Sequence, residues 1–127
     1  MKTTSLIARY LLGVIFLVFG LNGFLHFIPM PMPDGIAGQF MGAIFASHFY
    51  VVLFLLEIIP AVLLLAGRYV PLALVLLGPV IFNIFFFHAL MQPSGLPMAI
   101  IVVVLWLLVA AGVRSAFSGI LQARQTV

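Results

Sequence analysis

Five polar side chains interrupt stretches of sequence that are otherwise apolar enough to cross a membrane. They are Asn22, His26, Glu57, Asn83 and His88. Polar groups inside hydrocarbon are costly and usually face the interior of a helical bundle or a cavity. Side chains of these types can exchange protons, bind a polar ligand or form hydrogen bonds between helices. Their types and positions therefore predict a polar site within the membrane.

The depth of each side chain follows from the rise of about 1.5 Å per residue in an α-helix. His26 and His88 lie roughly 3–5 Å below the predicted outer boundary of the membrane. Asn22 lies roughly 9 Å below it, and Glu57 and Asn83 roughly 12 Å. Asn22 and His26 are also one helical turn apart and share a helix face. We therefore expect the polar side chains to gather in the outer half of the bundle.

Glu57 is the strongest candidate, because a carboxylate at that depth has to be protonated, paired or hydrated. The sequence places no lysine or arginine at the same depth in the membrane as Glu57. We expect its partners to be the two histidines, the two asparagines and Trp106. The indole N–H of Trp106 needs an acceptor, and Glu57 and Asn83 both lie at a suitable depth. Each asparagine taken alone is more typical of a hydrogen bond between helices, and each histidine fits an interfacial position equally well.

Two kinds of bound group are compatible with these residue types. Two histidines and a glutamate resemble a zinc ligand set, but they come from three spans without the close spacing of metal motifs, so no metal site is predicted. Histidine and glutamate can also exchange protons with a quinol, whose ring Phe85–Phe87 and Trp106 could flank. The absence of cysteine excludes thiol chemistry, iron–sulfur clusters and cysteine-bound metals.

The composition identifies an integral membrane protein. Of the 127 residues, 66% are hydrophobic and 6% are charged, whereas about 25% of the residues in a soluble domain are charged. The net charge of +3 rests on only five basic residues, and membrane topology explains where they lie. Nucleic-acid binding is therefore not expected. Since a spanning helix needs about 20 residues, the chain has room for about four.

The apolar runs predict an all-α, polytopic bundle of four transmembrane helices, over residues 10–28, 49–67, 70–91 and 96–113. We interpret the first as an uncleaved span, because it is longer than the apolar region of about 7–15 residues in a signal peptide. Residues 29–48 form the one long outer loop. Its prolines keep the start extended, and a short interfacial helix is expected over 35–47, N-capped by Asp34.

The basic residues predict how the bundle is oriented. When four spans are threaded, one side of the membrane receives Lys2, Arg9, Arg68, Arg114 and Arg124. The other side receives Asp34 and no basic residue. Because basic residues are enriched in cytoplasmic segments, both termini are expected in the cytoplasm.

Two long runs, "ARYLLGVIFLVFGLNGFLHF" and "LLEIIPAVLLLAGRYVPLALVLLGPVIFNIFFFHALMQPSGLP", resemble the DoxX-like family of small bacterial membrane proteins. The similarity extends from Arg9 to about Arg114. Its elements are the glycine-rich first span with Asn22, the glutamate of the second span, the segment "LLLAGRYVPLAL", and the span with Asn83 and His88. The resemblance implies a four-helix bundle in the bacterial cytoplasmic membrane.

The family takes its name from a subunit of a thiosulfate:quinone oxidoreductase, and other relatives are associated with redox stress or membrane assemblies. The resemblance therefore implies a membrane component of a redox system, without assigning catalytic residues.

Three functions are compatible with these residues and with the resemblance. The first, which we favour from the sequence, is a polar, outward-facing site that binds a small molecule such as a quinone within a redox system. The second is an accessory or structural subunit whose polar residues lock the helices together, and the third is a small transporter. Besides the lipid bilayer, the expected partners are a protein subunit or further copies of the chain. Gly13 and Gly20 offer a close-packing stripe, either for contact with another copy or for a contact inside the bundle.

Overall fold

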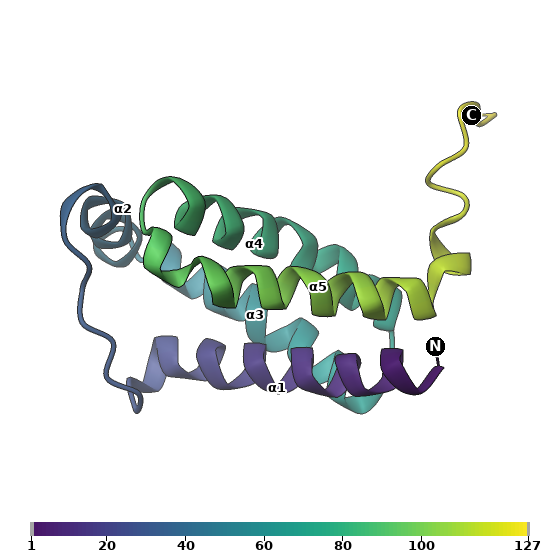
Figure 1. Ribbon diagram of the computed structural model, residues 1–127, viewed down its shortest axis with the longest axis horizontal. Helices are drawn as coiled ribbons and strands as arrows, with labels where there is room; N and C mark the ends of the chain where they lie inside the picture. The colour runs from purple at the N-terminus through teal and green to yellow at the C-terminus, as the bar shows by residue number, and fades with distance from the viewer. Residues whose placement is uncertain (1, 127) are drawn as a thin grey trace.

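The computed structural model describes residues 2–126, which fold into helices joined by short connections (Figure 1). Its elements are α1 (Lys2–Leu25), α2 (Gly35–Ala46), α3 (Phe49–Ala66), α4 (Val70–Leu90), the 3-10 turn η1 (Pro93–Gly95), α5 (Leu96–Gly112) and the 3-10 turn η2 (Arg114–Phe117). Within these residues, α1, α3, α4 and the continuous pair η1–α5 are long and apolar enough to span a membrane. The prediction of an all-α, multi-pass membrane protein is confirmed.

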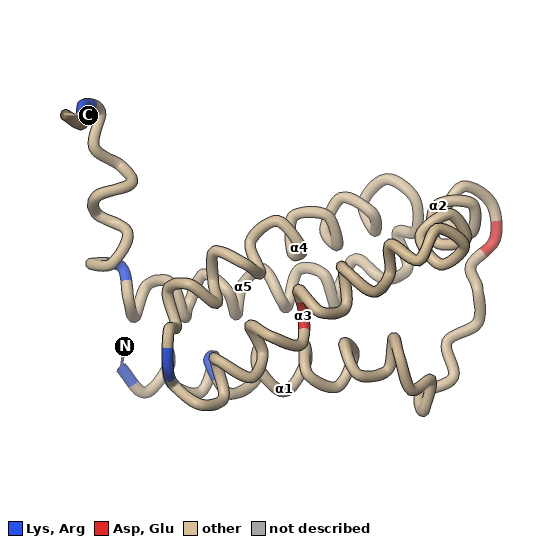
Figure 2. The backbone as a smooth tube through the Cα atoms, turned by 180° about the vertical axis from the view of Figure 1, so that it is seen from behind, with Lys and Arg blue, Asp and Glu red and all other residues tan. Residues whose placement is uncertain are grey.

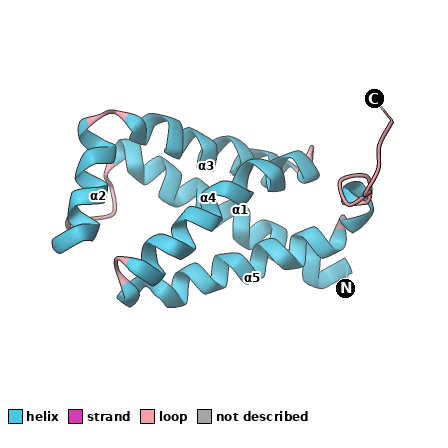
Figure 3. Cartoon of the chain, turned by 90° about the horizontal axis from the view of Figure 1, so that it is seen from above, coloured by secondary structure: helices cyan, strands magenta, loops and turns pink. Residues whose placement is uncertain are grey.

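The four long helices form a closed bundle. α1 packs against α3 and α5, and α4 packs against the same two helices from the other side (Figures 1 and 3). The centre of the bundle is filled by leucines that are fully buried, namely Leu12, Leu64, Leu74 and Leu77. Large apolar side chains also cover the outside of all four long helices, which is expected where helices face lipid.

The short helix α2 lies across the end of the bundle, roughly perpendicular to the long helices (Figures 1 and 3). Aromatic contacts hold it there: the Phe45 ring stacks on Tyr50 with centroids 5.1 Å apart, and Phe40 lies 5.5 Å from Phe87. The short helix predicted in the long loop is thus confirmed in place and length. One detail was wrong, because Asp34 occupies the N-cap position but its side chain makes no capping hydrogen bond.

The helix ends agree with the predicted boundaries except in the first span. α1 begins at Lys2 and stops at Leu25, whereas the sequence predicted a span over 10–28. It stops early because His26 adopts a left-handed backbone with φ of 53°, a conformation in which a helix cannot continue.

The turn between α3 and α4 is built around Gly67, as predicted. This glycine has a φ of 69°, and the N–H of Arg68 donates to the carbonyl of Leu63 at 3.1 Å, a typical helix C-cap. A Cβ atom at Gly67 would lie 2.6 Å from Nη1 of Arg9. The Arg9 guanidinium therefore lies against the C-terminus of α3, where the helix dipole favours a cation.

Charged residues are separated along the bundle axis (Figure 2). Every lysine and arginine of the described chain lies at the end that carries the two termini, and Asp34 lies at the opposite end. The remaining acidic residue, Glu57, lies midway along α3. The separation of basic residues expected from the threaded sequence is present in the folded chain.

Glycines allow α1 to approach α3 closely. A Cβ atom at Gly13 would lie 2.8 Å from Cγ of Leu65, and one at Gly20 would lie 2.7 Å from Cγ1 of Ile58. A Cβ atom at Gly23 would overlap the ring of Phe54. The close-packing stripe of Gly13 and Gly20 therefore contacts α3 inside the bundle.

Replacing one of these glycines tests the contact between α1 and α3. We expect Gly23→Ala to lower the free energy of unfolding by about 1–3 kcal/mol, because the added methyl group overpacks the interface with Phe54. The matched control is Gly42→Ala in α2, where an added Cβ meets no atom within 4 Å and removal of a helical glycine is mildly stabilising. Thermal unfolding in detergent micelles measures both changes, and equal effects would contradict this packing.

Candidate functional site

Glu57 is buried between helices. It lies in the middle of α3, its residue is 8% exposed, and a Cβ atom at Gly20 of α1 would lie 3.3 Å from the Cβ atom of Glu57. No residue in the described range 2–126 forms a hydrogen bond or an ion pair with its carboxyl group. Glu57 is therefore the one predicted site residue that is both buried and unpartnered in this part of the chain.

Asn22 closes the turn that follows α1. Its Nδ2 donates to the carbonyl of Ile28 at 3.2 Å, and the N–H of Ile28 donates to its Oδ1 at 2.7 Å. The side chain is buried, so both halves of the carboxamide are bonded to the backbone of one residue. Asn22 thus fixes the path of the chain out of the membrane.

His26 lies beyond the end of α1 and is exposed. Its N–H still donates to the carbonyl of Asn22 at 2.9 Å, but its left-handed backbone turns the chain away from the helix axis. The prediction that His26 and Asn22 share a helix face is wrong for this reason.

Asn83 and His88 both bond back to their own helix. Nδ2 of Asn83 donates to the carbonyl of Pro79 at 2.7 Å, and Nδ1 of His88 lies 2.8 Å from the carbonyl of Ile84. Because a carbonyl can only accept, the His88 bond requires a proton on Nδ1. The His88 ring also packs against Gly95 of η1, where a Cβ atom would overlap it. Asn83, in contrast, is exposed on the outside of α4.

Trp106 connects α5 to α4. Its Nε1–H donates to the carbonyl of Leu74 at 2.9 Å. The sequence predicted Glu57 or Asn83 as the acceptor, and that prediction was wrong. The bond joins residues 32 positions apart and satisfies the indole N–H, which is costly to leave unpaired in hydrocarbon.

The six predicted residues do not form one hydrogen-bonded cluster. Within residues 2–126, no hydrogen bond joins the side chains of any two of Asn22, His26, Glu57, Asn83, His88 and Trp106. The same residues include no group of three His, Cys, Asp or Glu side chains arranged to hold a metal ion. Every hydrogen bond that these side chains form is with a backbone group of the same chain.

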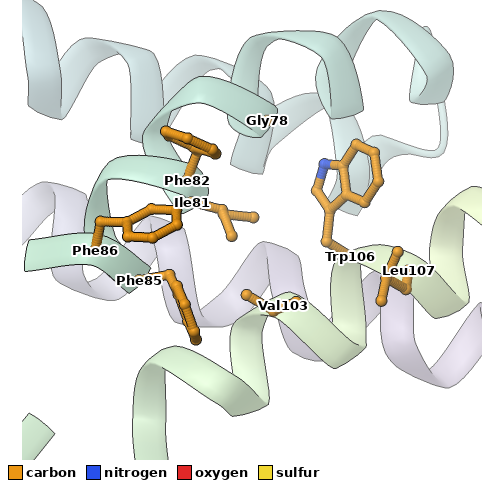
Figure 4. Close-up of a pocket in the computed structure, with 8 residues that line it drawn as sticks. All are labelled: Gly78, Ile81, Phe82, Phe85, Phe86, Val103, Trp106 and Leu107. Carbon is orange, nitrogen blue, oxygen red and sulfur yellow. The ribbon is translucent and has the colours of Figure 1, made fainter. Parts of the chain in front are cut away.

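An apolar groove lies between α4 and α5, with a volume of about 310 Å³. Figure 4 shows the side chains around it. The lining residues are Gly78, Ile81, Phe82, Phe85, Phe86, Val103, Trp106 and Leu107. The volume is at the lower end of the range for small-molecule sites, about 300–1,000 Å³. Since the indole N–H already bonds to Leu74, the groove offers a ligand apolar contacts and aromatic rings.

Sequence reasoning found part of this groove. Phe85, Phe86 and Trp106 were expected to flank a ring, and all three line the groove. Phe87 was expected there as well but contacts Phe40 of α2 instead. Gly78 was missed; it leaves space opposite the indole, whose Cζ2 would lie 3.9 Å from an added Cβ. The sequence around a glycine in an apolar run does not indicate which residue will face that glycine in the fold.

Comparison with known proteins adds no assignment: no protein-family model, curated protein or solved structure matches this chain.

The role of Asn22 can be tested by replacing it with an apolar residue of similar size. We expect Asn22→Leu to reduce the free energy of unfolding by about 1–3 kcal/mol, because the N–H and carbonyl of Ile28 lose their partners. The amide of Ile28 should also exchange faster with solvent deuterons.

The control for this change is His26→Gly, which suits a left-handed backbone and removes only an exposed ring. It should leave the exchange of Ile28 unchanged. A stable Asn22→Leu protein with normal protection at Ile28 would contradict the proposed role of Asn22.

Proposed function

We propose that this protein is a DoxX-like accessory component of a redox assembly in the bacterial cytoplasmic membrane. In this proposal its polar side chains stabilise the bundle, and a partner subunit carries out the chemistry. One observation carries the proposal: Asn22, His88 and Trp106 all direct their hydrogen bonds to backbone groups of their own chain. Side chains bonded in this way hold helices and turns in position.

The redox context of this proposal rests on the resemblance described above, in particular on the order of Asn22, Glu57, Asn83 and His88 along the chain. The membrane location rests on the four apolar helices. The orientation rests on the positive-inside rule, applied to a bundle whose lysines and arginines all lie at the end with the termini.

A second candidate function is the binding of a small lipid-soluble molecule such as a quinone, and two observations favour it. The groove between α4 and α5 is lined by aromatic rings and is large enough for a single ring system. Glu57 is buried without a hydrogen-bond partner in residues 2–126. Glu57 does not line the groove, so the ring and the carboxyl group would not be in contact in this arrangement.

Native mass spectrometry of the protein, purified gently from its own membranes, separates the two candidates. An accessory component should retain a protein partner that carries a redox cofactor, in a fixed ratio, and should retain no quinone. Glu57→Gln should keep that partner, because glutamine preserves the shape of the side chain.

A quinone retained by the unaltered protein would contradict the accessory role and support the second candidate. The groove would then be tested with Gly78→Leu, which fills the space beside Trp106. The control is Gly42→Leu in α2, where an added Cβ atom meets no atom within 4 Å. Loss of the quinone in the first variant alone would place it in the groove.

The orientation can be tested with single cysteines, because the chain has none of its own. Met30→Cys lies in the outer loop and Ser118→Cys in the C-terminal tail, and both positions are exposed. In intact spheroplasts, a membrane-impermeant maleimide should label the first and should reach the second only after the membrane is opened. The reverse pattern would show that the termini face outward.

A further inference from the structure

Asn83 has an unusual position for a carboxamide in a membrane-spanning helix. It is exposed on the outside of α4, seven residues before the end of the helix at Leu90, or about 10 Å along its axis. Its Nδ2 donates to Pro79, but its Oδ1 accepts no hydrogen bond from residues 2–126. Hydrocarbon offers no donor, so polar groups in spans usually face protein.

The exposure of Asn83 differs from that of the other polar residues in the spans. Away from the helix ends, the spans in residues 2–126 expose no other asparagine, glutamine, serine, threonine or charged side chain. Asn22 and Glu57 are both buried. The outer faces of α1, α3 and α5 are therefore apolar at this depth, and α4 alone presents a hydrogen-bonding group outward.

The residues around Asn83 follow the spacing of a coiled-coil seam. Steps of four and three residues alternate along one face of α4, through Leu72, Leu76, Pro79, Asn83, Phe86 and Leu90. Five of these six are exposed and Leu76 is half-buried, whereas the core face of the same helix is formed by other residues. This spacing is the one that allows a second helix to pack along a seam.

We propose that this outer face of α4 is the interface with a second copy of the chain, in which the two Asn83 side chains face one another. Two copies inserted in the same direction and related by a two-fold axis place identical residues at the same depth. A carboxamide complements itself, because Oδ1 can accept from the second Nδ2–H of its counterpart while the first remains bonded to Pro79. A single asparagine in a heptad seam is also known to fix register and the number of helices.

Other occupants of this face match it less well. A lipid chain would cover the apolar residues but leave Oδ1 of Asn83 without a donor. A different protein helix would need its own polar group at the depth of Asn83. A second copy supplies that group by symmetry alone.

Cross-linking in the membrane tests this interface. Because the chain contains no cysteine, only an introduced cysteine can form a disulfide. Leu72→Cys lies on the seam and Val62→Cys lies on α3, near the same end of the bundle; the two native residues are 48% and 50% exposed. Mild oxidation should form covalent dimers of Leu72→Cys, because seam residues of the two copies are close enough for a disulfide. It should form few dimers of Val62→Cys.

The contribution of Asn83 is measured by adding Asn83→Leu to Leu72→Cys. Because the residue is exposed in the single bundle, this change should leave folding intact. It should raise the dissociation constant of the dimer by about fivefold to thirtyfold, the range expected for a hydrogen bond between helices. Asn83→Gln keeps the carboxamide and should restore most of the affinity.

Equal cross-linking of the two cysteine positions, no dimer from Leu72→Cys, or an unchanged dissociation constant in Asn83→Leu would overturn the proposal. A cross-linked product whose mass corresponds to a different protein would assign the face to that protein and would overturn it as well.

Discussion

The close approach of α1 to α3 is the contact on which the rest of the bundle depends. Gly13, Gly20 and Gly23 bring the backbone of α1 against side chains of α3, so that dispersion contacts form where hydrophobic attraction between helices is absent. The same approach buries Glu57 beside Gly20. With α1 and α3 joined, α4 and α5 complete the ring around the leucine core.

Hydrocarbon provides no hydrogen bonds, and this explains how most of the polar side chains are arranged. Asn22, His88 and Trp106 each reach a backbone group of the same chain, so they stabilise a turn, a helix end and a contact between helices. Among the predicted site residues that lie within the long helices, the carboxyl group of Glu57 and Oδ1 of Asn83 are the exceptions. Glu57 is buried in the bundle and supports the second candidate function, whereas Asn83 faces outward and carries the proposed self-association.

Membrane insertion also gives the molecule two chemically different ends. The end with both termini carries all the lysines and arginines of the described chain, and the other carries Asp34 and the crossing helix α2 (Figures 1 and 2). Two copies inserted in the same direction would therefore align their basic ends, which is the arrangement that a parallel seam along α4 requires. Orientation, accessory function and self-association are in this way compatible with one fold.

The sequence alone determined the class of fold, the four spans, the crossing helix and the stop at Gly67, because the length of an apolar run, a group of prolines and a glycine act locally. It also identified the polar residues. It did not determine their partners: Trp106 bonds to Leu74, 32 positions away, and the left-handed backbone of His26 separates that ring from Asn22. Which way a side chain points depends on how helices pack and turn, and only the tertiary structure decides that.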